Sequence, residues 1–216
     1  MSMKIEDAHN RHKGETALMV GNGKNIYKTP PEWFDYPSFG LNTIFYYKDW
    51  KPTYYVAVDA CMYEGYGEMV KAAYPDVPKF VPSDLNLWTG DNFLYFKHRK
   101  GEAVTGGKPV TDANALRDGI GYTNSMTAAM QIAIHMGFTT LLMIGVEQKP
   151  GYGELVTHFW GDDPQMPKGQ TDEFWNIGYK QVRMSQPHVK VFNLSVDTYV
   201  PENILPRDSW QNWKNN

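Results

Sequence analysis

The residues whose types and spacing could do chemistry lie in short loops that follow apolar runs. The first loop is Gly21-Asn22-Gly23, which ends the apolar run at 16–20. Glycines let a backbone approach a phosphate closely, and free amides in such a turn can donate to its oxygens. The loop lacks the glycine spacing of a dinucleotide site and the Lys-Ser/Thr of a P-loop. The sequence therefore predicts either a phosphate-binding turn or a plain turn.

Polar residues lie near three other apolar segments. For each of them the sequence allows two interpretations, a ligand-binding role and a structural role. Asn42 lies within an apolar stretch, where an amide is unfavourable unless it meets a ligand or a backbone group. Asp59 directly follows an apolar run and could orient a sugar hydroxyl or cap the next helix. Asn124 and Ser125 open an apolar helical pattern, where short polar side chains and helix amides either hold an anion or cap the helix.

Candidates for proton transfer lie later in the chain. Glu147 ends an apolar run, and the segment 148–170, rich in Pro, Gly and aromatic residues, follows it. We interpret this segment as a lid or binding loop. His158 lies among its aromatic residues and is the histidine best placed for proton transfer. Asp162 begins a pair of carboxylates that could bind a divalent cation, although no pattern of carboxylates after a strand indicates a metal.

Elements that would position these residues can be read from the hydrophobic pattern. We expect strands at 16–20, 42–47, 54–58, 79–81, 92–96, 140–146 and 189–194, and helices over 125–136 and from 171 onward. This alternation predicts one Rossmann-like α/β domain, a mostly parallel sheet flanked by helices, with an aromatic lid loop. Ligands bind such sheets beyond the carboxyl ends of the strands, near the topological switch point.

Composition limits the class of protein. The chain has 216 residues, a net charge of −3 and 42% hydrophobic residues, so it can bury a core and has no overall attraction for nucleic acid. A single cysteine and the absence of a signal core or long apolar run predict a cytoplasmic protein. We expect residues 1–15 to form a loose leader and residues 16–216 a single nucleotide-binding domain. The chain has no G-x-S-x-G or H-E-x-x-H motif, so serine and zinc hydrolase mechanisms are not indicated.

Several of these segments together resemble a known group of enzymes. They are Leu18-Met-Val-Gly-Asn-Gly23, Asn42, Asn124-Ser125 and Ile144-Gly-Val-Glu147. In this combination the chain resembles the bacterial CMP-sialic-acid-dependent sialyltransferases and the wider superfamily that includes the archaeal 6-hydroxymethylpterin diphosphokinase. The likeness extends over roughly residues 16–200.

The resemblance implies roles for individual residues. It implies that Asn22, Asn42 and Ser125 contact the nucleotide donor, that no metal is needed, and that the domain carries a lid and commonly assembles as an oligomer. The family's base is a histidine that ends an H-aromatic-x-G-H segment. Here the segment reads His158-Phe-Trp-Gly-Asp162, so Asp162 occupies the position of the base and His158 that of the first histidine. Either residue is therefore a candidate for removing the proton.

The first functional hypothesis is a glycosyltransferase that moves a sugar from a nucleotide-activated donor to an acceptor hydroxyl without a cofactor. The turn 21–23 and Ser125 would hold the phosphates, and Asn42 and Asp59 would read the base or ribose. His158 or Asp162 would deprotonate the acceptor while the lid excludes water. Asn124 and Glu147 complete the predicted donor site.

Two further hypotheses stay open. A diphosphokinase-like enzyme would move a pyrophosphoryl group from Mg-ATP, which requires Mg²⁺ and carboxylates such as Asp59, Glu147 or Asp162. A non-catalytic nucleotide or glycan binder would keep the fold and lack the base. The pattern does not identify the acceptor, and a homo-oligomer is one expected assembly.

Overall fold

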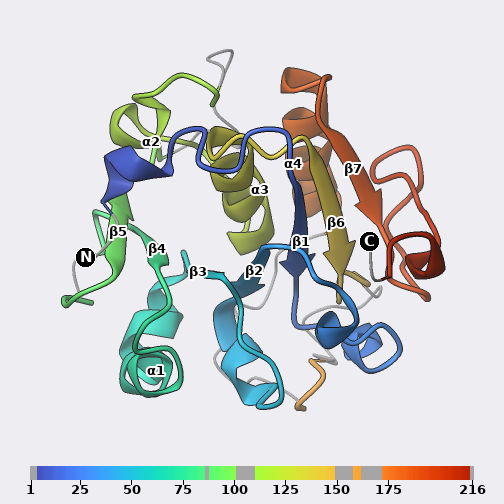
Figure 1. The fold of residues 1–216 in the computed structure, drawn as a ribbon, viewed down its shortest axis with the longest axis horizontal. Helices are drawn as coiled ribbons and strands as arrows, with labels where there is room; N and C mark the ends of the chain where they lie inside the picture. The colour runs from blue at the N-terminus through green and yellow to red at the C-terminus, as the bar shows by residue number, and fades with distance from the viewer. Residues whose placement is uncertain (1–3, 86–87, 101–109, 149–157, 162–171, 215–216) are drawn as a thin grey trace.

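The architecture is an α/β sheet of the doubly wound kind. The structure, a computed structural model, describes residues 4–85, 88–100, 110–148, 158–161 and 172–214. Within these residues seven parallel strands form one sheet in the order β5-β4-β3-β2-β1-β6-β7 (Figure 1). The chain moves outward from β1 to β5 and then returns to the other side of β1, so the switch point lies between β1 and β6. The predicted fold class is confirmed.

The strands are short and largely buried. They are β1 (Thr16–Val20), β2 (Ser38–Leu41), β3 (Tyr54–Val56), β4 (Lys79–Pro82), β5 (Phe93–Phe96), β6 (Thr140–Ile144) and β7 (Lys190–Asn193). The central strand β1 pairs with β2 on one side and with β6 on the other. Four consecutive residues of β1 are fully buried, as expected for a parallel strand that is covered on both faces.

Helices cover the two faces of the sheet. The α-helices are α1 (Ala60–Ala73), α2 (Ala115–Asp118), α3 (Ser125–His135) and α4 (Asp172–Ser185). The short 3-10 helices are η1 (Ile5–Ala8), η2 (Lys24–Tyr27), η3 (Pro31–Trp33), η4 (Asn42–Tyr46) and η5 (Trp210–Asn212). Ala17 and Met19 of β1 belong to the apolar cluster that contains side chains of α3 and α4, whereas Leu18 and Val20 belong to the cluster that contains side chains of α1. The alternation along β1 therefore divides the core into two layers.

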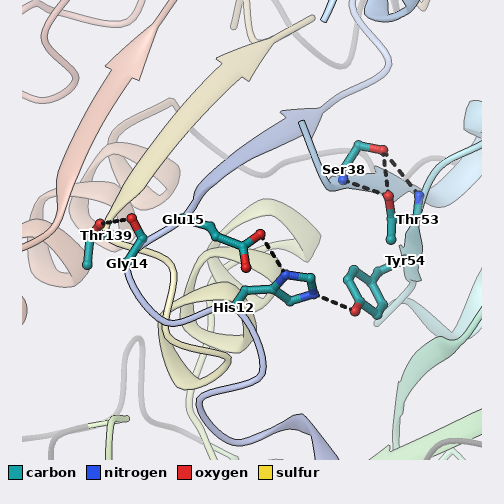
Figure 2. Close-up of polar contacts among 7 residues, drawn as sticks. All are labelled: His12, Gly14, Glu15, Ser38, Thr53, Tyr54 and Thr139. Atoms are coloured by element: carbon teal, nitrogen blue, oxygen red, sulfur yellow. Dashed lines mark hydrogen bonds and ion pairs between the residues drawn. The ribbon is translucent and has the colours of Figure 1, made fainter. Parts of the chain in front are cut away.

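Residues 4–14 are not the loose leader that the sequence analysis expected. Their backbone amides donate to carbonyls at the end of α3, groups that a helix leaves without an internal partner. His12 Nε2 lies 2.7 Å from Tyr54 Oη at the start of β3, and His12 Nδ1 lies 3.0 Å from Glu15 Oε2 (Figure 2). The His12 ring also stacks on Phe138, with ring centroids 4.5 Å apart. These contacts attach the segment to the amino edge of the sheet.

The expected strand at 42–47 is also wrong. Strand β2 ends at Leu41, and Asn42 begins the helix η4 with a φ of 45°, which a strand does not allow. The chain turns back so tightly that a Cβ on Gly40 would lie 2.9 Å from the Ile44 side chain. The glycine permits this packing, and the reversal places Asn42 at the carboxyl edge of the sheet.

None of the helices in the described ranges combines the length and apolar character needed to cross a membrane.

Candidate functional site

Two glycine turns meet at the switch point of the sheet. Gly21 follows β1, and Gly145 follows β6 with a φ of 65°. A Cβ on Gly21 would lie 2.5 Å from the carbonyl oxygen of Gly145, and the Gly23 amide donates to that oxygen at 3.0 Å. The close approach of two backbones therefore requires Gly21, independently of any ligand.

Glu147 occupies much of the turn that was expected to hold a phosphate. Its carboxylate accepts the backbone N–H of Lys24 at 3.0 Å and that of Asn25. Burial raises the pKa of the Glu147 carboxyl, and the two N–H groups oppose that rise. The Gly21 amide donates to a carbonyl of β6, and the Gly23 amide donates to Gly145. Together with the two amides that donate to Glu147, most amides of this loop are therefore satisfied within the protein. Glu147 thus organises the turn.

Asn22 keeps an unsatisfied group in the same turn. Its side-chain oxygen is buried and has no hydrogen-bond partner among the described residues, while its carbonyl accepts the Phe159 N–H at 2.9 Å. A buried amide oxygen without a donor is unfavourable, so such an atom calls for an explanation. A ligand that donates a hydrogen bond to it would remove the penalty.

A polar cluster lies farther along the carboxyl edge, where β2 and β3 end. Ser125 Oγ lies 2.9 Å from Asn42 Oδ1 and 3.1 Å from Asp59 Oδ2, so its hydroxyl can donate to either oxygen. Asn42 Nδ2 lies 3.3 Å from the same Asp59 oxygen. Tyr55 Oη donates to the Asn42 carbonyl at 2.7 Å and holds that residue in its left-handed conformation. The structure therefore brings together three residues that the sequence analysis placed on separate loops.

The structure also decides which of these residues cap helices. Asp59 precedes α1, yet its side chain makes no capping hydrogen bond. Asn124 caps α3, because its Oδ1 accepts the Thr127 N–H at 2.8 Å. Ser125 is thereby left to bridge Asn42 and Asp59. Burial raises the pKa of the Asp59 carboxyl, and the hydrogen bonds from Ser125 and Asn42 oppose that rise.

The segment 158–161 links the two parts of the edge. His158 forms a β-bridge with Gly23 and is 5% exposed. Trp160 Nε1 donates to Thr43 Oγ1 at 3.0 Å, next to Asn42, and its ring lies 4.9 Å from that of Tyr46. His158 therefore lies beside the first turn, and the indole extends toward the polar cluster.

Some site features lay beyond sequence reasoning. Asp162 falls outside the described residues, and so does most of the expected lid. Thr43 and Tyr55 carry no signal that would distinguish them from core residues, and the aromatic richness around Trp160 predicted a lid or binding loop but not its contact with Thr43. In the described part of the chain no three His, Cys, Asp or Glu side chains gather closely enough to hold a metal ion. Metal independence stays a prediction.

Comparison with known proteins supports the fold and the resemblance. No protein-family model and no curated protein matches the sequence. The sialyltransferase CstII from Campylobacter jejuni, in complex with the substrate analogue cytidine-5'-monophosphate, has a similar structure with a TM-score of 0.55 and 11% identity. The match covers 94% of this chain and 88% of that one.

Two structures of Cst-II variants in complex with CMP match equally widely. Their TM-scores are 0.54 and 0.51, each with 12% identity and 94% of this chain covered, against 89% and 88% of those chains. These likenesses support the sialyltransferase part of the resemblance and not the diphosphokinase part. At such low identity the comparison establishes a shared sialyltransferase-like α/β fold.

Proposed function

We propose that this protein is a glycosyltransferase that binds a nucleotide-activated sugar at the carboxyl edge of its sheet and transfers the sugar to an acceptor hydroxyl. The observation that carries the proposal is the cluster of Asn42, Asp59 and Ser125. It lies at the edge where ligands bind in doubly wound sheets. The structurally similar sialyltransferases were solved with CMP, which makes a cytidine nucleotide the first ligand to test.

Charge distinguishes the roles within the cluster. A carboxylate repels a phosphate, so Asp59 suits a ribose hydroxyl or a base amine, each of which can donate to it. Ser125 begins α3, an eleven-residue helix whose positive end favours a phosphate. The Ser125 hydroxyl can leave Asn42 and donate to a phosphate oxygen instead. In this arrangement the buried oxygen of Asn22 accepts a further donor from the nucleotide.

The first test removes one hydroxyl. We expect Ser125→Ala to weaken CMP binding about tenfold, because a hydrogen bond to a charged group contributes about 1.5–3 kcal/mol. The measurement is calorimetric titration of CMP without a divalent metal. Ser185→Ala, an exposed serine at the end of α4, is the matched control and should bind CMP as the unaltered protein does. Equal affinity of both variants, or stabilisation by Mg-ATP alone, would contradict the proposal.

A second test concerns proton removal. If His158 is the base, His158→Ala lowers the turnover of a CMP-sugar about 10²–10⁴-fold while CMP affinity stays within a few-fold. His188→Ala, an exposed histidine before β7, is the control. If only Asp162→Asn produces that loss, Asp162 is the base. A chain that binds CMP but consumes no donor would be a binding protein and not a transferase.

A further inference from the structure

A cavity lies along the same edge of the sheet, outside the cluster described above. It has a volume of about 580 Å³ and is lined by Tyr95 of β5, by residues that directly follow β4 and β5, and by Arg117 of α2. Backbone hydrogen bonds hold its walls together: the Lys97 amide donates to Leu116, and the Ile120 amide donates to Lys97. The cavity is therefore formed by paired backbone segments.

The lining carries more positive than negative charge. Lys97, Lys100 and Arg117 contribute three cations, and Asp84 contributes one carboxylate. Asp84 Oδ2 lies 3.2 Å from Lys100 Nζ and 3.8 Å from His98 Nδ1, so its charge is already matched. In the described part of the chain neither Lys97 nor Arg117 forms an ion pair. Two cations that line one pocket and have no counterion among the described residues favour an anionic ligand.

The cavity adjoins the proposed nucleotide site. The His98 ring stacks on that of Tyr122, with centroids 4.2 Å apart. Tyr122 lies three residues before Ser125, a separation that a chain spans in at most about 11 Å. Burial raises the pKa of the Tyr122 hydroxyl, and the negative charges of Asp84 and Asp59 raise it further. Tyr122 thus connects the two sites, through its stacking on His98 on one side and the short chain to Ser125 on the other.

We propose that this cavity binds the anionic group of the sugar acceptor, a carboxylate or a phosphate, and thereby selects acidic acceptors. The inference rests on the proposed transferase function. An acceptor held by its anion at Lys97 and Arg117 would extend past Tyr122 toward Asn42 and Asp59. Transfer to neutral acceptors would lack this attraction, so the cavity would act on acceptor affinity and not on the donor.

The test measures binding of two probes, inorganic phosphate and D-glucuronate, at fixed pH and at an ionic strength held constant with chloride. Titrations are repeated with saturating CMP, since inorganic phosphate can also occupy the nucleotide site. We expect Lys97→Met/Arg117→Met to weaken binding of the preferred probe at least about tenfold, because hydrogen bonds to charged groups contribute about 1.5–3 kcal/mol each. The probe that binds with the higher affinity indicates whether the acceptor carries a phosphate or a carboxylate.

Matched controls separate this site from general electrostatics. Lys180→Met/Lys190→Met removes two exposed cations from α4 and β7 and should leave probe binding unchanged. Arg117→Lys keeps the charge and should retain most of the affinity. CMP should bind the pocket variant as tightly as it binds the unaltered protein.

Three results would overturn the inference: no binding of either probe, equal loss in the Lys180/Lys190 control, or loss of CMP affinity in the pocket variant. The last result would assign these cations to the nucleotide. Absence of CMP binding in the unaltered protein would instead contradict the proposed function. Because probe binding is also measured without CMP, failure of the proposed function can be told apart from failure of the inferred anion site.

Discussion

Asp59 combines burial, negative charge and neutral neighbours. Its carboxylate faces the Ser125 hydroxyl and the Asn42 amide, and no cation is among these partners. Burial therefore raises its pKa despite two hydrogen bonds. Proteins keep such unfavourable groups mostly where a ligand or a reaction needs them. A substitution that removes the Asp59 charge should therefore change the stability of the protein and its ligand affinity in opposite directions.

We expect Asp59→Asn to stabilise the protein at neutral pH and to weaken CMP binding. Because the folded-state pKa of Asp59 exceeds the unfolded-state value, the folded protein binds this proton more tightly than the unfolded chain does. The stability that Asp59 contributes is thus present below the unfolded-state pKa and lost as the pH rises through the folded-state pKa. The gain in Tm of the variant should be largest at pH 7 and vanish toward pH 3. A variant less stable than the unaltered protein at pH 7 would refute this reasoning.

Several site residues could be predicted singly from the sequence because polar side chains after apolar runs meet at one edge of a parallel sheet. Asp59 follows that rule, whereas Asn42 was expected inside a strand and Ser125 was a candidate because it opens an apolar helical pattern. The role of Glu147 could not be predicted, because its contact with Lys24 depends on β1 and β6 being neighbours. Hydrophobic periodicity does not reveal the order of strands in a sheet. The loop that the Glu147 side chain contacts can therefore be identified only from the folded structure.

At the level of elements, the turns after β1 and β6 form one packed unit. A Cβ on Gly21 would meet backbone, the Gly145 carbonyl oxygen at 2.5 Å. A Cβ on Gly23 would meet a side chain, the Glu147 carboxylate at 2.6 Å. A backbone neighbour cannot move away without distorting β6, whereas a side chain can rotate. The two glycines should therefore respond differently to the same substitution.

This difference can be measured with a double-mutant cycle. Gly23→Ala should destabilise the protein by about 1–3 kcal/mol, because displacing Glu147 leaves two backbone amides without their acceptor. In a Glu147→Ala background the same substitution should have little further effect. Gly21→Ala is the control, with a loss that persists in both backgrounds. The free energy of unfolding in urea gives each value, and additive losses for Gly23→Ala and Glu147→Ala would disprove the proposed contact.

Helices α3 and α4 can be predicted from the sequence because their apolar residues recur at helical spacing. The same pattern does not identify α1. Two glycines at 65 and 67 interrupt the pattern and lower the helix propensity. The fold explains the second of them, since a Cβ on Gly67 would lie 2.4 Å from Trp88 Nε1. Tertiary packing of an indole against the helix therefore outweighs local preference.

Over the whole molecule, the proposed function gives the two edges of the sheet separate tasks. The carboxyl edge gathers the polar cluster and the cationic cavity. Residues 4–14 contact the amino edge, where His12 meets Tyr54 and Gly14 meets Thr139 (Figure 2). The class of fold could be predicted from alternating strands and helices. The attachment of the first residues could not, because a short polar segment has no periodicity and its partners lie far along the chain.

The division of tasks predicts that His12→Ala lowers stability without changing binding. The variant loses the hydrogen bonds to Tyr54 and Glu15 and the stacking on Phe138. These losses should lower the free energy of unfolding by about 1–3 kcal/mol, while CMP affinity stays unchanged because the opposite edge is intact. His188→Ala, an exposed histidine, should change neither quantity. Urea unfolding and CMP titration on the same preparations check both parts. A fall in CMP affinity as large as the fall caused by Ser125→Ala would show that the two edges are coupled, and the sheet would then transmit changes from the amino edge to the nucleotide site.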